Sequence, residues 1–102
     1  MHLVRLAARI DDNQREIVSA LRAVGCSVQS LAAVGQGVPD LLVYSPRRGL
    51  MLIEVKNGNL PPSRQKRTDA QLIWHAEWRG PVFVVASVDE ALALDKPDNK
   101  KR

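Results

Sequence analysis

The segment Leu50–Lys56, with the sequence LMLIEVK, constrains the fold of this 102-residue chain more than any other segment does. Apolar residues occupy both of its alternating faces, a pattern that indicates a strand covered on both sides. Two of its side chains are nevertheless charged, and Glu54 and Lys56 point to the same face because they lie two residues apart. Burying either charge alone is expensive. The segment therefore predicts a buried strand whose charges are paired, lie at an open end of the sheet, or bind a cation.

The rest of the chain divides into further helices and strands. A helix is expected over residues 13–24, because Asp11 or Asp12 can cap its start, apolar residues repeat at helical spacing, and Gly25 follows it. Proline and glycine in the link over residues 45–49 are typical of a hairpin. The other expected elements are strands over residues 26–31, 40–44 and 50–56, a helix over 68–78, a strand over 82–86 and a helix over 89–94.

These elements give the order α-β-β-β-α-β-α. A hairpin followed by a helical crossover into another strand predicts a mixed central sheet flanked by helices, and hence an α/β fold. A chain of 102 residues has room for one hydrophobic core, so a single domain is expected over residues 1–94. The polar and basic end over residues 95–102 is expected to be a frayed tail.

Three carboxylates are expected to converge beside Lys56. Asp40 begins one strand of the hairpin, Glu54 ends its partner, and Glu16 lies on the flank of the first helix, about 100° around its axis from Ile17. Such an all-oxygen set suits Mg²⁺ or Mn²⁺. A hard dication there polarises a phosphate and lowers the pKa of a bound water, which Lys56 can hold or deprotonate. The pattern therefore indicates metal-assisted hydrolysis of phosphodiesters.

Each of these signals also has a purely structural explanation. A Glu-x-Lys sequence by itself is most often an exposed cross-strand ion pair, and Pro-Asp commonly starts a turn or a strand. Glu16 taken alone is compatible with a solvated helix flank. The combination favours a catalytic site, because a hairpin of suitable length places Asp40 near Glu54 and Lys56, and a helix with a correctly faced glutamate precedes both.

The same residues resemble the PD-(D/E)xK nuclease signature, at Gly37-Val38-Pro39-Asp40 and Ile53-Glu54-Val55-Lys56. Over residues 12–94 the chain is similar to the VRR-NUC branch of that superfamily, particularly its short stand-alone proteins of phages and prophages. Further matching segments lie at residues 13–18, 35–43, 54–58, 68–71 and 74–75. The loop over residues 60–67 departs from the family pattern, because it is longer and more basic.

The resemblance implies a restriction-endonuclease-like domain that works as a metal-dependent DNA endonuclease. It also implies a structured or branched DNA substrate, such as a flap or a Holliday junction, and a homodimer as the working form. Gln71 carries over as the second-helix glutamine, although it also has the spacing to complete a helix cap with Thr68. The implied catalytic residues are Asp40, Glu54, Lys56 and Gln71, and the implied metal ligands are Glu16, Asp40, Glu54 and the main-chain carbonyl of Val55.

Basic residues favour an anionic partner. Fifteen Lys and Arg against eleven Asp and Glu give a net charge of +4 and a pI near 9.7. Arg64, Lys66 and Arg67 follow the site strand closely and are expected to contact DNA phosphates, although a basic loop also serves solubility. No base-reading element is identifiable, so recognition of DNA shape is expected rather than recognition of sequence.

Two other classes of function remain open from the sequence. A DNA-binding module of the same fold without catalysis is the first, although a binder has no need for the carboxylates and the lysine together. A small protein-interaction domain is the second, and salt-sensitive DNA binding would exclude it. Trp74 and Trp78 lie on one helical face, which suits core or dimer packing as well as base stacking.

Several sites and locations are excluded by composition. A single cysteine excludes an internal disulfide and a Cys-cluster zinc site, and two distant histidines exclude the usual His-based zinc sites. No apolar run approaches the roughly 18 residues of a membrane helix. Arg5 and Arg9 interrupt any signal-peptide core, so a cytoplasmic protein is expected.

Overall fold

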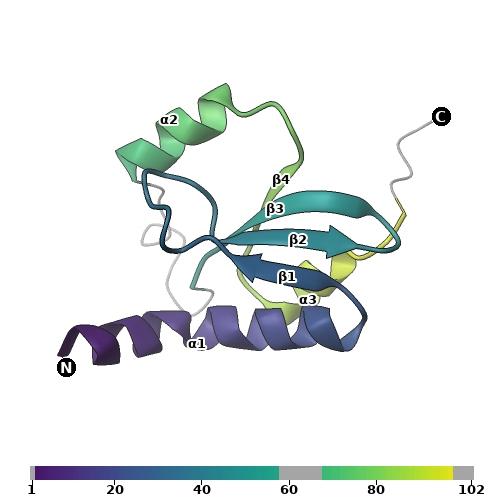
Figure 1. Cartoon of the computed structure of the whole chain (residues 1–102), viewed down its shortest axis with the longest axis horizontal. Helices are drawn as coiled ribbons and strands as arrows, with labels where there is room; N and C mark the ends of the chain where they lie inside the picture. The colour runs from purple at the N-terminus through teal and green to yellow at the C-terminus, as the bar shows by residue number, and fades with distance from the viewer. Residues whose placement is uncertain (1, 58–67, 98–102) are drawn as a thin grey trace.

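The computed structural model describes residues 2–57 and 68–97 (Figure 1). Its elements have the expected order, and their ends lie within one residue of the expected ones, apart from the start of the first helix. No helix in these ranges is both long and apolar enough to cross a bilayer. The elements are α1 (His2–Ala23), β1 (Ser27–Ser30), β2 (Leu41–Ser45), β3 (Gly49–Val55), α2 (Asp69–Glu77), β4 (Val82–Val85) and α3 (Val88–Ala93).

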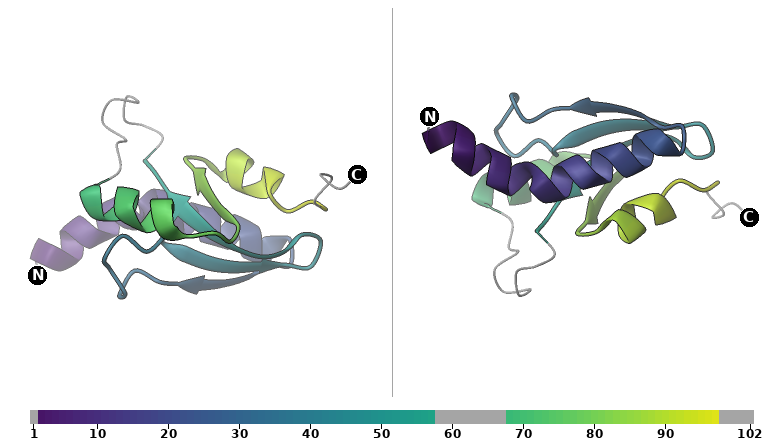
Figure 2. Two further views of the ribbon diagram at one scale, coloured as in Figure 1. Left: turned by 90° about the horizontal axis from the view of Figure 1, so that it is seen from above. Right: turned by 90° about the horizontal axis from the view of Figure 1, so that it is seen from below.

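The four strands form one mixed sheet in the order β1-β2-β3-β4. The first three are antiparallel neighbours, whereas β4 runs parallel to β3 after the crossover through α2. α1 and α3 pack together against one face, while α2 lies on the opposite side, near the end of the sheet where β3 finishes (Figures 1 and 2). The predicted α/β domain with a mixed, helix-flanked sheet is therefore confirmed.

The hydrophobic core lies between the sheet and the helices α1 and α3. Ile17 and Leu21 of α1 both have 0% exposure, and they pack with the inner face of the sheet, where Leu41 pairs with Ile53. Each fully buried aliphatic side chain contributes roughly 1.5–3 kcal/mol to stability. Because both α1 side chains must face the sheet, the core fixes the rotation of α1 about its axis.

α1 begins at His2 rather than near residue 13, so Asp11 and Asp12 lie inside the helix and not at its cap. An aspartate inside a helix costs less than about 1 kcal/mol. A helix that has already nucleated lengthens across such a residue, because each added residue gains a hydrogen bond. The C-terminal end is as expected: Gly25 adopts φ +97°, and the Cys26 amide donates to the Leu21 carbonyl at 3.0 Å, which forms a Schellman motif.

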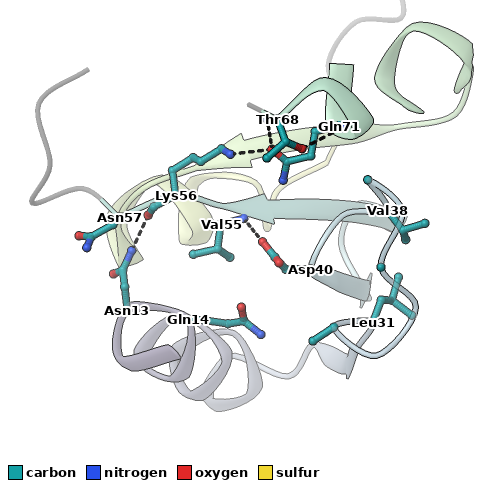
Figure 3. Close-up of a pocket in the computed structure, with 13 residues that line it drawn as sticks. Asn13, Gln14, Leu31, Val38, Asp40, Val55, Lys56, Asn57, Thr68 and Gln71 are labelled. Carbon is teal, nitrogen blue, oxygen red and sulfur yellow. Dashed lines mark hydrogen bonds between the residues drawn. The ribbon is translucent and has the colours of Figure 1, made fainter. Parts of the chain in front are cut away.

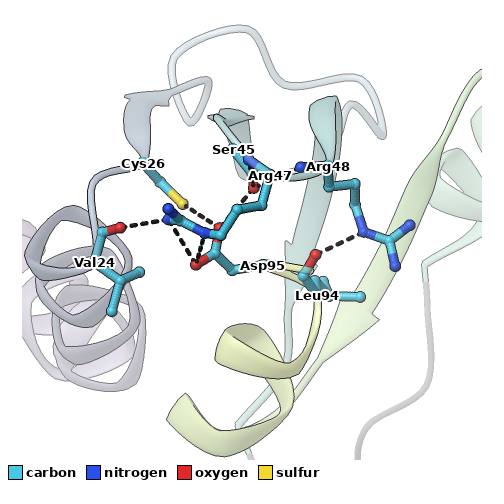
Figure 4. Close-up of polar contacts among 7 residues, drawn as sticks. All are labelled: Val24, Cys26, Ser45, Arg47, Arg48, Leu94 and Asp95. Carbon is cyan, nitrogen blue, oxygen red and sulfur yellow. Dashed lines mark hydrogen bonds and ion pairs between the residues drawn. The ribbon is translucent and has the colours of Figure 1, made fainter. Parts of the chain in front are cut away.

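The turn between β2 and β3 holds the C-terminal end of α3 (Figure 4). Asp95 Oδ1 accepts a hydrogen bond from Ser45 Oγ at 2.6 Å, and Asp95 Oδ2 accepts one from Arg47 Nε at 2.9 Å. Arg48 Nε donates to the Leu94 carbonyl at 2.6 Å. Asp95, the first residue of the expected tail, is thus part of the packed structure, whereas residues 98–102 lie outside the described residues.

The polar groups at this turn satisfy one another. Burial raises the pKa of Asp95, but hydrogen bonds from Arg47, Ser45 and Cys26 and the charge of Arg47 outweigh it, so the pKa lies below its ordinary value. Burial and the neighbouring Asp95 raise the pKa of the Cys26 thiol. Arg47 also donates to the Val24 carbonyl at the end of α1. The turn therefore ties α1, β2 and the end of α3 together.

Candidate active site

The pairing of β2 with β3 places Asp40 at the opposite end of the sheet from this turn. Leu41 lies across from Ile53, so Asp40, the preceding residue, is a neighbour of Glu54. Asp40 Oδ2 accepts a hydrogen bond from the Val55 amide at 2.7 Å. The carboxylate is therefore fixed against the last residues of β3, where the sequence predicted it.

Glu54 and Lys56 project together at the end of β3, as their spacing predicts. Lys56 Nζ lies 3.4 Å from Glu54 Oε2, and the two side chains are only 14% and 3% exposed. Gln71 of α2 completes the group, because its Nε2 donates to Glu54 Oε2 and its Oε1 accepts from Lys56 Nζ at 3.2 Å. This is a buried, hydrogen-bonded arrangement rather than the exposed ion pair that a Glu-x-Lys sequence also allows.

Gln71 combines the two roles that the sequence left open. Thr68 Oγ1 accepts from the Gln71 amide at 3.2 Å, and Gln71 Oε1 accepts from the Thr68 amide at 2.9 Å, which together form a capping box at the start of α2. The same Oε1 atom accepts from Lys56 (Figure 3). The helix cap therefore also sets the position of the lysine.

A close approach of two backbones brings α2 to the site. Gly37, in the loop before β2, has φ +85°, and a Cβ atom there would lie 2.2 Å from the Ala70 carbonyl oxygen. A residue with a side chain would force the two segments apart. The segment over residues 37–40 therefore does more than supply the Asp40 carboxylate. Its glycine also lets the first turn of α2, with Gln71, approach the site.

The pKa of Glu54 is raised. Burial is the main cause, the charge of Asp40 adds to it, and the contacts with Lys56 and Gln71 oppose both without cancelling them. Among the residues that the structure describes, none donates a hydrogen bond to the buried Glu54 Oε1. An unpaired carboxylate oxygen of this kind is costly, and a bound cation would satisfy it.

A cavity of about 520 Å³ opens beside these groups (Figure 3). Its walls come from α1, the loop before β2, the end of β3 and the start of α2, and Val55 is part of the wall. Glu54 does not itself line the cavity, but it contacts two residues that do, Gln71 and Lys56. The polar side chains that line the cavity include Asn13, Gln14, Asp40, Lys56, Thr68 and Gln71.

Asn13 joins α1 to the ends of two strands. Its Nδ2 donates to the Lys56 carbonyl at 2.7 Å and to the Ala86 carbonyl at 3.2 Å, just beyond the ends of β3 and β4. Sequence reasoning gave this residue no role. A signal was present, because Asn13 lies four residues before Ile17 and so continues the buried stripe of α1 as a polar residue.

Glu16 does not join Asp40 and Glu54. It lies on the other flank of α1, where it lines a separate cavity with Ser87 and Asp89 at the start of α3. The rotation imposed by the buried core residues accounts for this, because it turns the opposite flank of α1 toward the site. Within the described ranges, no three acidic, histidine or cysteine side chains are grouped so that they could hold a metal ion. The structure thus gives two converging carboxylates rather than the expected three.

The fold matches a known structure. A solved structure described as a VRR_NUC domain aligns with this chain at a TM-score of 0.62 and 32% sequence identity, over 83% of this chain and 91% of that chain. The chain belongs to the VRR-NUC family. This confirms the family resemblance noted in the sequence and makes the chain a nuclease-type domain. No protein-family model and no curated protein sequence matches it.

In this VRR-NUC domain, four of the residues that the family resemblance selected lie together: Asp40, Glu54, Lys56 and Gln71. The predicted DNA-contacting residues Arg64, Lys66 and Arg67 lie outside the described residues. Sequence reasoning missed Asn13, Gln14 and the packing role of Gly37. The glycine was visible in the motif, but its contact with α2 depends on tertiary structure.

Proposed function

We propose that this protein is a divalent-metal-dependent DNA endonuclease that hydrolyses phosphodiester bonds with an activated water. One observation carries the proposal: Asp40 and Glu54 adjoin at the end of β3, while Gln71 holds Lys56 beside Glu54 at the rim of an open cavity. A module that only binds DNA gains nothing from this arrangement, because a buried carboxylate with a raised pKa costs stability.

The residues present fit a hard divalent cation, on which nuclease domains of this fold generally depend. Glu54 Oε1 has no donor among the described residues, Asp40 lies next to it, and Val55 adjoins both at the cavity wall. Asp40, Glu54 and the Val55 carbonyl would hold the ion through oxygen atoms, as Mg²⁺ and Mn²⁺ prefer. When bound, it supplies polarisation of the phosphate and a lowered pKa for water.

Lys56 holds the attacking water or a phosphate oxygen. An ammonium group carries three hydrogens, and among the described residues Gln71 and Glu54 account for two of them. Because Lys56 also lines the cavity, we propose that its third hydrogen reaches the water or the phosphate oxygen. Gln71 and Glu54 thereby orient the lysine, and the positive charge offsets the negative charge that builds up on phosphorus.

The proposed substrate is structured or branched DNA, of the flap or Holliday-junction type. The net charge of +4 suits a polyanion, and Arg64, Lys66 and Arg67 are proposed phosphate contacts beside the site strand. The cavity lies at the end of the sheet, and we place the scissile phosphate of the DNA there.

We also propose that the working form is a homodimer. α2 buries none of its residues within the chain, and Leu72, Ile73 and Trp78 are 51%, 62% and 44% exposed. Trp78 stacks on Trp74 with ring centroids 4.9 Å apart, and β4 is an edge strand with Val84 41% exposed. Covering these surfaces with a second copy would give two sites related by a two-fold axis, which suits paired cuts in a symmetric junction.

Cleavage assays test the nuclease proposal. The protein is incubated with linear, flapped and four-way DNAs in Mg²⁺, Mn²⁺ or EDTA, and products are followed on denaturing gels. Cleavage in metal and none in EDTA is the expected result, with branched DNAs cut faster than linear duplex. Salt-sensitive binding of the same DNAs without cleavage in either metal would instead identify a catalytically silent DNA-binding module.

Sedimentation tests the dimer. At micromolar concentration the protein should sediment with about twice the chain mass of 11.3 kDa. Ile73→Glu should give a monomer, because it places a charge on the most exposed apolar residue of α2. Ser19→Glu adds the same charge on exposed α1 surface and should stay dimeric. A wild-type monomer that still makes paired cuts in four-way junctions would contradict the dimer.

A further inference from the structure

α1 presents two polar residues on opposite flanks, and only one of them reaches the candidate active site. Gln14 lines the cavity together with Asp40, Val55 and Lys56. Its side chain extends from α1 toward the space in front of Asp40 (Figure 3). Glu16, two residues later, lines a different cavity beside α3. The helix therefore offers the site a neutral amide and not a carboxylate.

The rotation of α1 that produces this arrangement is fixed by the fold. Two residues along a helix correspond to a turn of about 200°, so Gln14 and Glu16 cannot face the same cavity. Rotating α1 to bring Glu16 inward would expose Ile17 and Leu21, which are both 0% exposed. It would also break the two hydrogen bonds from Asn13 to the strand ends. The packing of Ile17 and Leu21 and the hydrogen bonds of Asn13 thus both favour Gln14 as the site residue.

We propose that Gln14, rather than Glu16, is the metal-site residue of α1, and that its amide oxygen completes the oxygen set of Asp40 and Glu54. This inference rests on the proposed metal-dependent function. Amide oxygens are ordinary ligands of hard divalent cations. With Gln14 in this place the protein contributes two negative charges to the cation instead of the three expected from the sequence. Among the described residues, no three Asp, Glu, His or Cys side chains are grouped so that they could hold a metal ion, which agrees with that count.

A site with one charge fewer binds its cation more weakly, because affinity for hard cations rises with the number of charged ligands. The chain is therefore expected to need a higher free metal concentration than a three-carboxylate site. Gln14→Glu should restore the missing charge at the same position and with nearly the same shape. Gln14→Ala should remove the ligand without adding charge.

Calorimetric titration of Mn²⁺ into the DNA-free full-length protein tests the assignment without relying on activity. Gln14→Glu should lower the Kd by about tenfold, and Gln14→Ala should raise it by about tenfold. Glu16→Gln should leave it within about twofold. Gln29→Glu is the matched control, because it adds the same charge on an exposed part of β1. Circular dichroism establishes that each variant is folded.

The outcomes separate this inference from the function on which it rests. If Asp40→Asn and Glu16→Gln both weaken Mn²⁺ binding while the two Gln14 variants do not change it, the assignment of Gln14 is wrong and the metal-dependent function stands. If the wild type takes up no Mn²⁺ at millimolar concentration, the proposed function fails and this inference fails with it. Opposite shifts of the Kd in Gln14→Glu and Gln14→Ala support the assignment.

Discussion

Each end of the sheet buries a carboxylate beside a basic side chain, but the pKa of the carboxylate shifts in opposite directions at the two ends. Glu54 and Asp95 have side chains that are only 3% and 8% exposed. The pKa of Glu54 is raised, whereas the pKa of Asp95 is lowered. A nearby basic side chain therefore does not by itself decide the direction of the pKa shift.

Burial and the charge of Asp40 raise the pKa of Glu54, whereas hydrogen bonds and the charge of Arg47 lower that of Asp95. Asp95 accepts from Ser45, Arg47 and Cys26, so both of its oxygens have donors. Glu54 receives its contacts at Oε2, its Oε1 has no donor among the described residues, and Asp40 adds a second negative charge. At the end of the sheet with the β2–β3 turn, the charge of Asp95 is fully hydrogen-bonded, and these contacts stabilise the fold. The other end leaves Glu54 Oε1 without a donor among the described residues, and this is where the proposed cation would bind.

The largest expected difference between the two ends is in reaction rate. Lys56→Ala should reduce cleavage in saturating Mn²⁺ by about a thousandfold or more, because it removes the group proposed to hold the attacking water. Asp95→Asn should leave the rate per folded molecule within about twofold. Single-turnover cleavage of a flapped DNA measures both. A Lys56→Ala variant with wild-type turnover would show that the site has been assigned wrongly.

Stability should change in opposite directions at the two ends. Asp95→Asn should lower the free energy of unfolding by about 1–3 kcal/mol, because it weakens hydrogen bonds from the buried Ser45 and Cys26 and the ion pair with Arg47. In EDTA, Glu54→Gln should raise the melting temperature, because it removes a charge that burial and Asp40 disfavour and keeps an acceptor for Lys56. Thermal unfolding measures both, with the exposed Glu77→Gln as the control. A fall in melting temperature for both variants would refute the contrast.

A smaller effect on the cleavage rate is expected from Gly37→Ala, which tests whether the close packing of Gly37 on α2 positions the candidate active site. The added Cβ would overlap the Ala70 carbonyl, so the first turn of α2 should shift and carry Gln71 away from Lys56. The cleavage rate should fall by about tenfold, since small misplacements at active sites are costly. Gly35→Ala is the matched control, because it also has a positive φ but no atoms near its Cβ. Equal effects would point to backbone strain alone.

The smallest effect expected is a difference in acid stability. Because the pKa of Asp95 is lowered in the folded state, its stabilising contribution is complete above its ordinary value of 3.8 and is lost as the pH falls through the lower folded value. The difference in stability between wild type and Asp95→Asn should therefore shrink below pH 3.8. Urea unfolding at a series of pH values measures it, and a constant difference would contradict the role given to Asp95.

The order of the elements and the core of the site could be predicted because the signals are local. The alternating pattern of β3 and the spacing of Glu54 and Lys56 determine a shared face without reference to the rest of the fold. The capping box at Thr68 and Gln71 is likewise a matter of sequence separation. Asp40 was predictable because a hairpin fixes the register between neighbouring strands.

The choice between Gln14 and Glu16 could not be made from helical periodicity. Each lies beside the buried stripe of α1, and which flank meets the end of β3 depends on how the whole helix crosses the sheet. The contacts of Asp95 were hidden for a related reason, because polar residues near a chain end are common in frayed tails. Its partners Ser45 and Arg47 lie about fifty residues away in the sequence.

Gln71 Oε1 accepts from both the Thr68 amide and Lys56, and this limits which residues can replace Gln71. Either glutamine or glutamate at this position would complete the helix cap with Thr68. Only glutamine also supplies an N–H to Glu54, and glutamate would instead place a further negative charge beside a carboxylate whose Oε1 has no donor among the described residues. One side chain thus both caps α2 and contacts Lys56 and Glu54. Position 71 should therefore tolerate fewer residue types than a position that only capped a helix or only contacted a lysine.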